Sequence, residues 1–181
     1  AIELRQAAAQ GHRKLILTPG NYGQDFLTRH GLDGLGVPVV KCANFIGDAL
    51  DQAAAEGFES VLLVGHVGKL VKLAGGIMNT HSRYADCRTE LFCAYAAVCG
   101  GGQALCEALL DSATTDACIA LLDQAGLRAP VMARLLAAID GHVRRRAAGA
   151  YPVGVLLFSN VYGVLGQTKG YEEVLHEWKE G

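Results

Sequence analysis

The chain has 181 residues, a formal net charge of −2 at pH 7 and a hydrophobic share of 51%. This length suits one domain with a full core, and the charge excludes a general basic surface for nucleic acid. No apolar run approaches the ~20 residues that a membrane span needs, and no signal-peptide pattern is present.

Strands and helices alternate in the first part of the chain. The expected elements are, in order, a helix at 2–10, a strand at 14–18, a helix at 24–30, a strand at 37–42, a helix at 44–56 and a strand at 58–65. Asn44 is expected to cap the third of these helices with its side chain. Strands separated by helices and short connections predict parallel βαβ units with right-handed crossovers.

A helical pattern follows and gives way to one more strand. The expected elements are helices at 89–99, 103–110, 115–126 and 130–148, a strand at 153–158, an ambiguous segment at 160–168 that can form a hairpin, and a helix at 171–179. The segment 89–99 is apolar nearly all round, which predicts a buried helix. Arg144–Arg146 close the long helix. Without interleaved aromatic residues, these arginines favour a solvated helix end over a nucleic-acid patch.

These elements predict an α/β fold. We expect a single domain over residues 1–181, with an open, mostly parallel, Rossmann-like sheet of about four strands, flanking helices and a helical stretch at about 89–149. The chain begins at Ala1, without methionine and inside a predicted helix. We therefore expect it to be part of a longer protein.

Six cysteines are scattered through the chain, and none forms a C-x-x-C pair. Four of them lie in alanine- and leucine-rich helical sequence, so we interpret them as small apolar thiols of a reducing, cytoplasmic compartment. The spacing of His66, His81 and the cysteines matches no closed zinc site, and we predict no resident metal.

Polar, glycine-rich segments follow each of the four predicted strands. They are residues 18–23, 41–44, 65–69 and 159–160. Because the carboxyl ends of parallel strands share one edge of a sheet, we expect these four segments to converge on one cleft.

Two familiar glycine motifs do not fit these segments. Gly65-x-x-Gly68-Lys69 has too few residues between its glycines for a phosphate loop, and Leu70 stands where a magnesium-binding hydroxyl is needed. The dinucleotide fingerprint is absent after the first strand, and Lys41 stands in place of a ribose-binding acid. The loop around Gly20 suits either close approach of an adenosyl group or a plain tight turn.

Cations gather in and near the proposed cleft. They are Lys41, His66, Lys69, Lys72, His81, Arg83 and Arg88. Asp86 and Glu90 are the only acids between residues 66 and 90, whereas a solvated face would mix the two signs more evenly. The imbalance favours a site for a ligand with several carboxylates or phosphates.

Several blocks, in this order, resemble the C-terminal half of the CbiD family, the cobalt-precorrin-5B C1-methyltransferases of anaerobic cobalamin (vitamin B12) biosynthesis. The blocks are residues 17–23, 41–48, 65–76 and 80–83. The family's N-terminal half has no counterpart here, so the resemblance implies the C-terminal domain of a longer chain whose activity alone is not assured. The oligomeric state stays open.

The resemblance implies an enzyme that transfers a methyl group from S-adenosylmethionine to a corrinoid precursor, an anionic tetrapyrrole-derived macrocycle that carries the cobalt. The implied roles are adenosyl binding by Gly20, Asn21, Gly23, Asn44 and Asp48; substrate binding by Lys41, Lys69, Lys72, Thr80, Ser82 and Arg83; and catalysis by His66 and His81. Each histidine can be a general base or a neutral donor to a carboxylate.

Another reading assigns only macrocycle binding to this chain and places the donor site in the missing N-terminal half. Both readings require the cations at the cleft. A purely structural or interaction domain would leave Lys69, Lys72 and Arg83 without a purpose. The two ligand-binding hypotheses differ over whether the chain itself binds S-adenosylmethionine.

Overall fold

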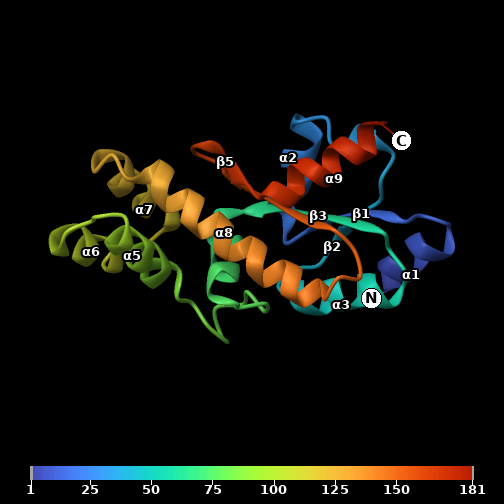
Figure 1. The fold of residues 1–181 in the computed structure, drawn as a ribbon, viewed down its shortest axis with the longest axis horizontal. Helices are drawn as coiled ribbons and strands as arrows, with labels where there is room; N and C mark the ends of the chain where they lie inside the picture. Colours follow the sequence, from blue (N-terminus) through green and yellow to red (C-terminus); the bar gives the residue numbers. More distant parts are fainter. Residues whose placement is uncertain (1, 181) are drawn as a thin grey trace.

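The computed structural model describes residues 2–180, which form a five-stranded sheet in the order β2-β1-β3-β4-β5 (Figure 1). The strands are β1 (Lys14–Thr18), β2 (Val39–Lys41), β3 (Ser60–His66), β4 (Val153–Ser159) and β5 (Gly163–Gln167). The first four are parallel, and β5 pairs antiparallel with β4. The open, mostly parallel sheet is confirmed. The estimate of about four strands is corrected, because the ambiguous segment forms a hairpin with β4.

Helices cover both faces of the sheet. Their bounds are α1 (Ile2–Ala9), α2 (Asn21–Arg29), η1 (Asp33–Leu35), α3 (Ile46–Ala55), α4 (Val67–Leu70), η2 (Val71–Gly75), α5 (Arg88–Val98), α6 (Gln103–Leu110), α7 (Thr115–Gln124), α8 (Arg128–Ala147) and α9 (Lys169–Glu180). In Figure 1, α2 and α9 lie on one face, and α1, α3 and α8 lie on the other. No helix among these elements is long and apolar enough to cross a membrane.

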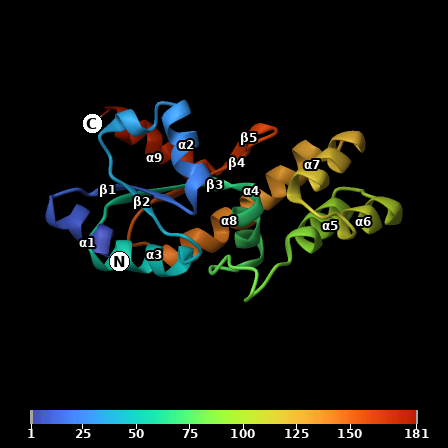
Figure 2. The ribbon, with the colours of Figure 1, turned by 180° about the vertical axis from the view of Figure 1, so that it is seen from behind.

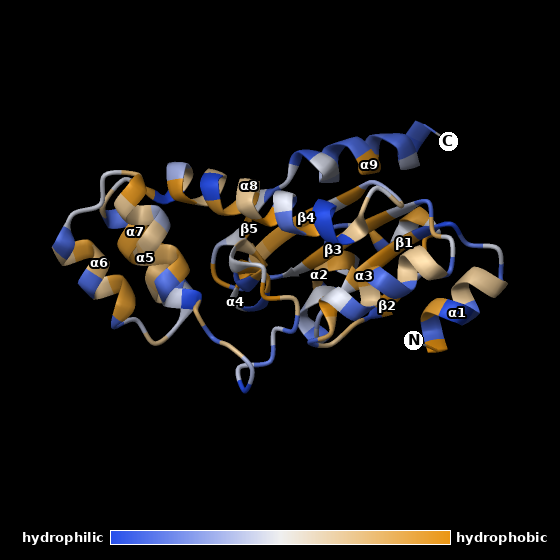
Figure 3. Ribbon diagram, turned by 60° about the horizontal axis from the view of Figure 1, so that its bottom comes forward, coloured by the Kyte–Doolittle hydropathy of each residue, from blue (hydrophilic) through white to orange (hydrophobic). Residues whose placement is uncertain are grey.

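The central strands are buried on both faces, so nearly every position on them is apolar. Leu62 and Val64 of β3 pack with α2 and α9, whereas Val61 and Leu63 point to the larger core under α3 and α8. In Figure 3 the central strands are mostly hydrophobic, whereas α9, which covers one face, is largely hydrophilic. This pattern explains why continuous apolar runs correctly predicted the strands.

The chain moves from β1 to β2 on one side and then returns to place β3 on the other side of β1. The strand order therefore reverses between β1 and β3. In open α/β sheets, ligands bind outside the carboxyl ends of the strands at such a point. The residues at these two ends are Thr18 and His66.

A small helical unit, α5 to α7, lies beyond this edge and packs against α8 (Figure 2). The helices predicted there are confirmed, but the burial predicted for 89–99 is wrong. Phe92 and Ala96 are the fully buried apolar residues of α5, and Val98 near its end is 63% exposed. One side of α5 packs against α6, α7, α8 and η2, and the other side is left open to solvent.

Two of the three arginines in the last turn of α8 are held in ion pairs. Arg144 Nε lies 2.7 Å from Asp140 Oδ2, and Arg146 Nε donates to Asp51 Oδ1 at 2.7 Å. Pairing of this kind is expected of a helix end whose cations complement the dipole, and it reduces the charge available to a nucleic acid.

Candidate functional site

The larger of two adjoining pockets lies outside the carboxyl ends of β1 and β3 and has a volume of about 640 Å³. Four segments form its walls: the turn from β1 into α2, the turn from β3 into α4, the start of α5 and the start of α7. The lining residues are Pro19, Gly20, Asn21, Tyr22, His66, Gly68, Lys69, Arg88, Thr114, Thr115 and Asp116. Its volume falls in the usual range for small-molecule sites.

The second pocket, called here the basic pocket, has a volume of about 320 Å³. It is lined by Asn44, Gly68, Lys69, Lys72, Thr80, His81, Ser82 and Arg88. Gly68, Lys69 and Arg88 line both pockets. The two pockets therefore adjoin along a wall that carries two cations.

Lys69 lies at the centre of this wall. Its Nζ donates to Asn44 Oδ1 at 2.9 Å, and a Cβ built on Gly20 would lie 3.6 Å from it. Gly20 has a φ of 85°, which favours glycine at this turn. Burial lowers the pKa of Lys69; the Cys42 thiol opposes this shift and the charge of Lys72 adds to it. The ammonium thus links the loops after β1, β2 and β3.

Asn44 does not cap α3, so that prediction is wrong. The residue before the helix is Phe45, and it makes no side-chain capping bond. Asn44 Oδ1 instead accepts hydrogen bonds from Lys69 Nζ and, at 3.3 Å, from Thr80 Oγ1. A long-range role replaces the local one, because Lys69 presents a stronger donor than a backbone amide.

Lys72 is in the wall of the basic pocket, but its donors are already used. Its side chain is 3% exposed, and Nζ donates to the carbonyl oxygens of Thr80 at 3.1 Å and Ala85 at 2.8 Å. Asp86 Oδ1 lies 3.7 Å away. This geometry ties the 77–87 loop to η2, and it does not favour the substrate contact predicted for Lys72.

Arg88 was noted as a cation in the sequence, but its position between two pockets was not foreseen. Its guanidinium makes a two-pronged contact with Asp86, with Nη2 donating to Oδ2 at 2.9 Å. The hydrogen bonds from Arg88 hold the pKa of the Asp86 carboxyl below its usual value. The carboxylate therefore stays charged and fixes the guanidinium at the wall.

His66 and His81 share one local geometry on opposite sides of Lys69. Gly68 N–H donates to His66 Nδ1 at 3.0 Å, and Arg83 N–H donates to His81 Nδ1 at 3.1 Å. In each case the donor lies two residues further along the chain. Each imidazole thus has its Nδ1 occupied and its Nε2 free of a partner within residues 2–180.

Burial lowers the pKa of His66, and the negative charge of Asp116 opposes that shift. In the unfolded chain the histidine pKa is about 6.5. Above that pH the lowered pKa of the folded state has no effect on stability, whereas below it the unfolded chain binds a proton that the folded chain does not, and the free energy of unfolding falls. We expect the free energy of unfolding to fall more between pH 7.5 and 5.5 in the parent chain than in His66→Asn. Urea titrations at the two pH values measure this, and His176→Asn, on the exposed face of α9, should behave as the parent. A drop of equal size in His66→Asn would contradict the expectation.

The start of α7 was missed as a contributor to the site. The Thr114 side chain caps α7, and Asp116 accepts a hydrogen bond from Ser159 Oγ at 2.7 Å. Ser159 Oγ in turn accepts from the N–H groups of Val161 and Tyr162. The carboxyl end of β4 is thereby tied to the helical unit. Its sequence signal is only that of a helix start, so no local pattern could have revealed the contact.

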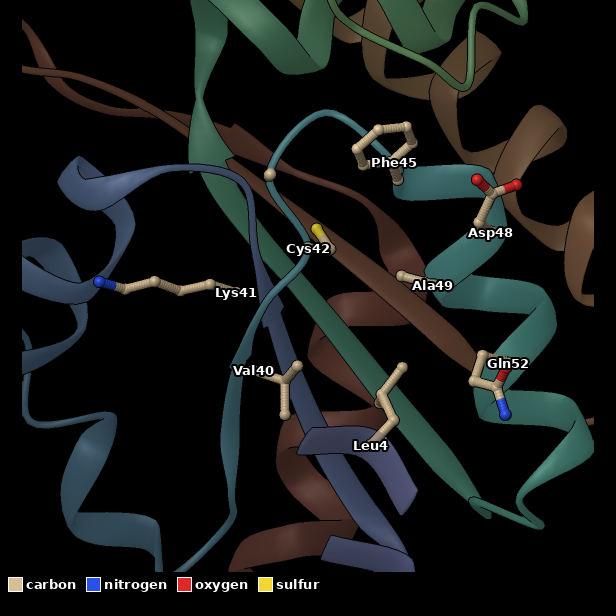
Figure 4. A pocket seen from close by; sticks show the side chains of 9 residues that line it. Leu4, Val40, Lys41, Cys42, Phe45, Asp48, Ala49 and Gln52 are labelled. Atoms are coloured by element: carbon tan, nitrogen blue, oxygen red, sulfur yellow. The ribbon is translucent and has the colours of Figure 1, made fainter. Parts of the chain in front are cut away.

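A third pocket, the α3 pocket, separates other predicted residues from the first two (Figure 4). Its volume is about 330 Å³, and Asp48 lies on its rim. Lys41 also lines it, but the side chain extends away from the pocket and Nζ donates to Asn21 Oδ1 at 3.4 Å. Burial raises the pKa of the Cys42 thiol in this pocket to about 11, which excludes a reactive thiolate at neutral pH.

The predicted site residues are therefore only partly together. The larger pocket takes Gly20, Asn21 and His66; the basic pocket takes Asn44, Lys72, Thr80, His81 and Ser82; Lys69 lines both; Lys41 and Asp48 line the α3 pocket.

Two further predicted residues line none of these three pockets. A Cβ on Gly23 would lie 1.5 Å from Thr18 Oγ1, so Gly23 packs against the end of β1. Arg83 is exposed on the loop beside the basic pocket. Within residues 2–180, no three His, Cys, Asp or Glu side chains cluster as metal ligands.

Comparison with protein families gives a match to the model described as CbiD, C-terminal domain, over residues 79–169. Among curated proteins, the chain is 41% identical over 161 residues to a cobalt-precorrin-5B C(1)-methyltransferase of Ruminiclostridium cellulolyticum, with 88% of the chain and 41% of that protein covered. Proteins of the same name are 37% identical over 178 residues in Photorhabdus laumondii and 34% identical over 181 residues in Listeria monocytogenes.

These last two matches cover 97% and 99% of the chain but 47% and 48% of the relatives. The chain thus spans roughly one third to one half of the length of the curated relatives it matches. No solved structure gives a significant match.

Proposed function

The chain belongs to the CbiD family, and we propose that it is the C-terminal domain of an S-adenosylmethionine-dependent enzyme that methylates C1 of cobalt-precorrin-5B in anaerobic cobalamin biosynthesis. Cobalt enters only with the substrate. The curated relatives share the name cobalt-precorrin-5B C(1)-methyltransferase, which supports this proposal. We place the reaction in the cytoplasm, because all six cysteines are free thiols in the structure.

The observation that carries the proposal is the wall shared by the two pockets. Lys69 and Arg88 stand there with neighbouring hydrogen-bond donors, at the reversal point of the sheet. A corrinoid precursor carries many carboxylates on a broad apolar ring. Tyr22 and Tyr84, which are 60% and 72% exposed near this wall, add the apolar surface that such a ring needs.

The larger pocket is of a size that could hold the methyl donor. Gly20 allows close approach to the backbone, and the Asn21 amide and the Tyr22 ring offer polar and aromatic contacts. S-adenosylmethionine, when bound, would supply an electrophilic methyl group on a sulfonium. The residues of the wall would act by positioning the two reactants, and positioning alone contributes much of the rate in such transfers.

One observation favours the alternative, in which this domain binds the macrocycle and the methyl donor binds elsewhere in the longer protein. The five residues assigned to the donor do not lie in one pocket: Gly20 and Asn21, Asn44, and Asp48 line three different ones, and Gly23 lines none of them. Two cations in the larger pocket also suit carboxylates better than a sulfonium.

Calorimetric titration with S-adenosylhomocysteine separates the two readings. If the donor binds here, we expect micromolar affinity that Asn21→Ala weakens by about fivefold to tenfold, the usual effect of one lost hydrogen bond. Asn160→Ala is the matched control, because Asn160 follows β4 outside the three pockets. If the folded chain does not bind S-adenosylhomocysteine, the donor site in this domain is ruled out, and the reading in which the domain binds only the macrocycle is favoured.

A further inference from the structure

The two histidines at this edge have the same hydrogen-bond arrangement, although they lie in different segments. His66 ends β3 and lines the larger pocket, and His81 lies in the 77–87 loop and lines the basic pocket. In each, Nδ1 accepts a backbone N–H from the residue two positions later, at 3.0 Å for His66 and 3.1 Å for His81.

A backbone N–H can only donate a hydrogen bond, so the ring nitrogen that receives it must present its lone pair. The single proton of a neutral imidazole is then on Nε2. If this proton moved to Nδ1, or if a second proton were added there, an Nδ1–H would face the backbone N–H. The backbone amide therefore disfavours the tautomer in which Nε2 could accept a proton, and it disfavours the imidazolium as well.

The surroundings of His66 act in the same sense. Phe158 of β4 contacts the ring edge-on at 5.7 Å between centroids, and Tyr22 of α2 lies at 6.1 Å. Burial lowers the pKa of His66, and Asp116 of α7, the one acid among the residues that line the pocket, opposes this shift. His81 has Tyr84 edge-on at 6.4 Å and lies on an exposed loop.

We propose that His66 and His81 are hydrogen-bond donors that hold two carboxylates of the macrocycle through Nε2–H, on either side of Lys69, and that neither is the proton acceptor of the reaction. This inference rests on the proposed function for its ligand, and on the reading in which the larger pocket, lined by His66, receives part of the macrocycle and the methyl donor binds elsewhere in the longer protein. It assigns the histidines to substrate positioning and decides between the two roles that the sequence left open. Any proton acceptor that the methylation requires is then another group.

The tautomers can be observed directly. In the 15N-labelled chain at neutral pH, long-range 1H–15N correlation spectra are expected to give a protonated Nε2 and an unprotonated Nδ1 for both rings. Protonated Nδ1 on either ring would overturn the inference for that residue, whatever ligand the chain binds.

A pair of substitutions separates recognition from local structure at His66. In His66→Asn, Oδ1 replaces Nδ1 and keeps the bond from Gly68 N–H, but no donor reaches the Nε2 position. In His66→Gln, the amide reaches that position and the bond from Gly68 is lost. His81→Asn and His81→Gln make the same pair on the other side, and His176→Gln on α9 is the control.

The probe is uroporphyrin, a polycarboxylate tetrapyrrole, and its binding is measured by fluorescence titration together with Tm for each variant. We expect His66→Asn to keep Tm and to bind about tenfold more weakly, as for the loss of one charge-assisted hydrogen bond. We expect His66→Gln to bind within about threefold of the parent, since a donor remains.

Each outcome has one meaning. Normal binding by His66→Asn with weak binding by His66→Gln would show a purely structural role and overturn the inference. Equal losses in both variants would overturn it as well, because a retained donor would then have no value. Failure of the parent chain itself to bind uroporphyrin would overturn the proposed macrocycle function and, with it, the ligand assigned to the histidines, even with the tautomers as expected.

Discussion

Replacement of Lys69 by methionine is expected to weaken uroporphyrin binding by about tenfold to a hundredfold, which corresponds to about 1.5–3 kcal/mol for hydrogen bonds to a charged group. Lys69 is the only lysine that lines both pockets among the described residues, and its Nζ donates to Asn44 Oδ1 at 2.9 Å. Methionine keeps the length of the side chain and removes the cation. The loss should therefore be one of affinity, measured by fluorescence titration.

The stability of Lys69→Met should stay close to that of the parent, because Asn44 Oδ1 keeps its bond from Thr80 Oγ1 and the site remains open to water. Lys169→Met is the control for charge, since Lys169 is 83% exposed at the start of α9. Similar weakening by Lys169→Met would mean that net charge alone attracts the probe. An unchanged affinity in Lys69→Met would refute the role of the shared wall.

Most of the fold could be predicted because its signals are local. Continuous apolar runs between helical patterns indicated β1 to β4, and they did so because both faces of these strands are covered. The extent to which the helices of the α5–α7 unit are buried was not predictable in this way. The sequence of α5 is apolar nearly all round, but how much of the helix is covered depends on which elements pack against it. Only Phe92 and Ala96 of α5 are fully buried.

The site was predictable to the extent that it depends on strand ends. Four loops were expected to converge on one cleft. The loops after β1 and β3 meet at the larger pocket and Asn44 after β2 reaches Lys69, but residues 159–160 after β4 line none of the three pockets. Asn44 shows where this reasoning ends, because its sequence context is that of a helix cap and its partners are 25 and 36 residues away. The contribution of α7 through Asp116 depends on the packing of a helical unit that no local pattern specifies.

Lys69 and Lys72 are three residues apart in sequence, and both line the basic pocket. Their environments nevertheless differ. The side chain of Lys72 is 3% exposed, and its Nζ donates to the carbonyls of Thr80 and Ala85. A spacing of three residues indicates that two side chains point the same way, but it does not show whether their charged groups are free. The loop after η2 folds back over Lys72 and occupies its ammonium group.

Replacement of Lys72 by methionine is therefore expected to lower the free energy of unfolding by about 2 kcal/mol, because the buried carbonyl of Thr80 and the partly buried carbonyl of Ala85 lose their donor. For a chain of this length, the corresponding fall in Tm is about 4–8 °C. Denaturant unfolding measures the change, and hydrogen exchange should show faster exchange of amides in the 77–87 loop. Lys179→Met, at an exposed position of α9, is the control and should leave stability unchanged.

The two lysines should then show opposite patterns. Lys69→Met should reduce affinity and spare stability, whereas Lys72→Met should reduce stability first and reduce affinity only through the displaced loop that carries His81. Lys72→Arg is a stricter test, because a guanidinium keeps the charge but does not fit two carbonyls spaced for an ammonium, so stability should fall in this variant also. A stable Lys72→Met chain that binds uroporphyrin weakly would restore Lys72 to the substrate-binding set and contradict the role assigned from its buried contacts.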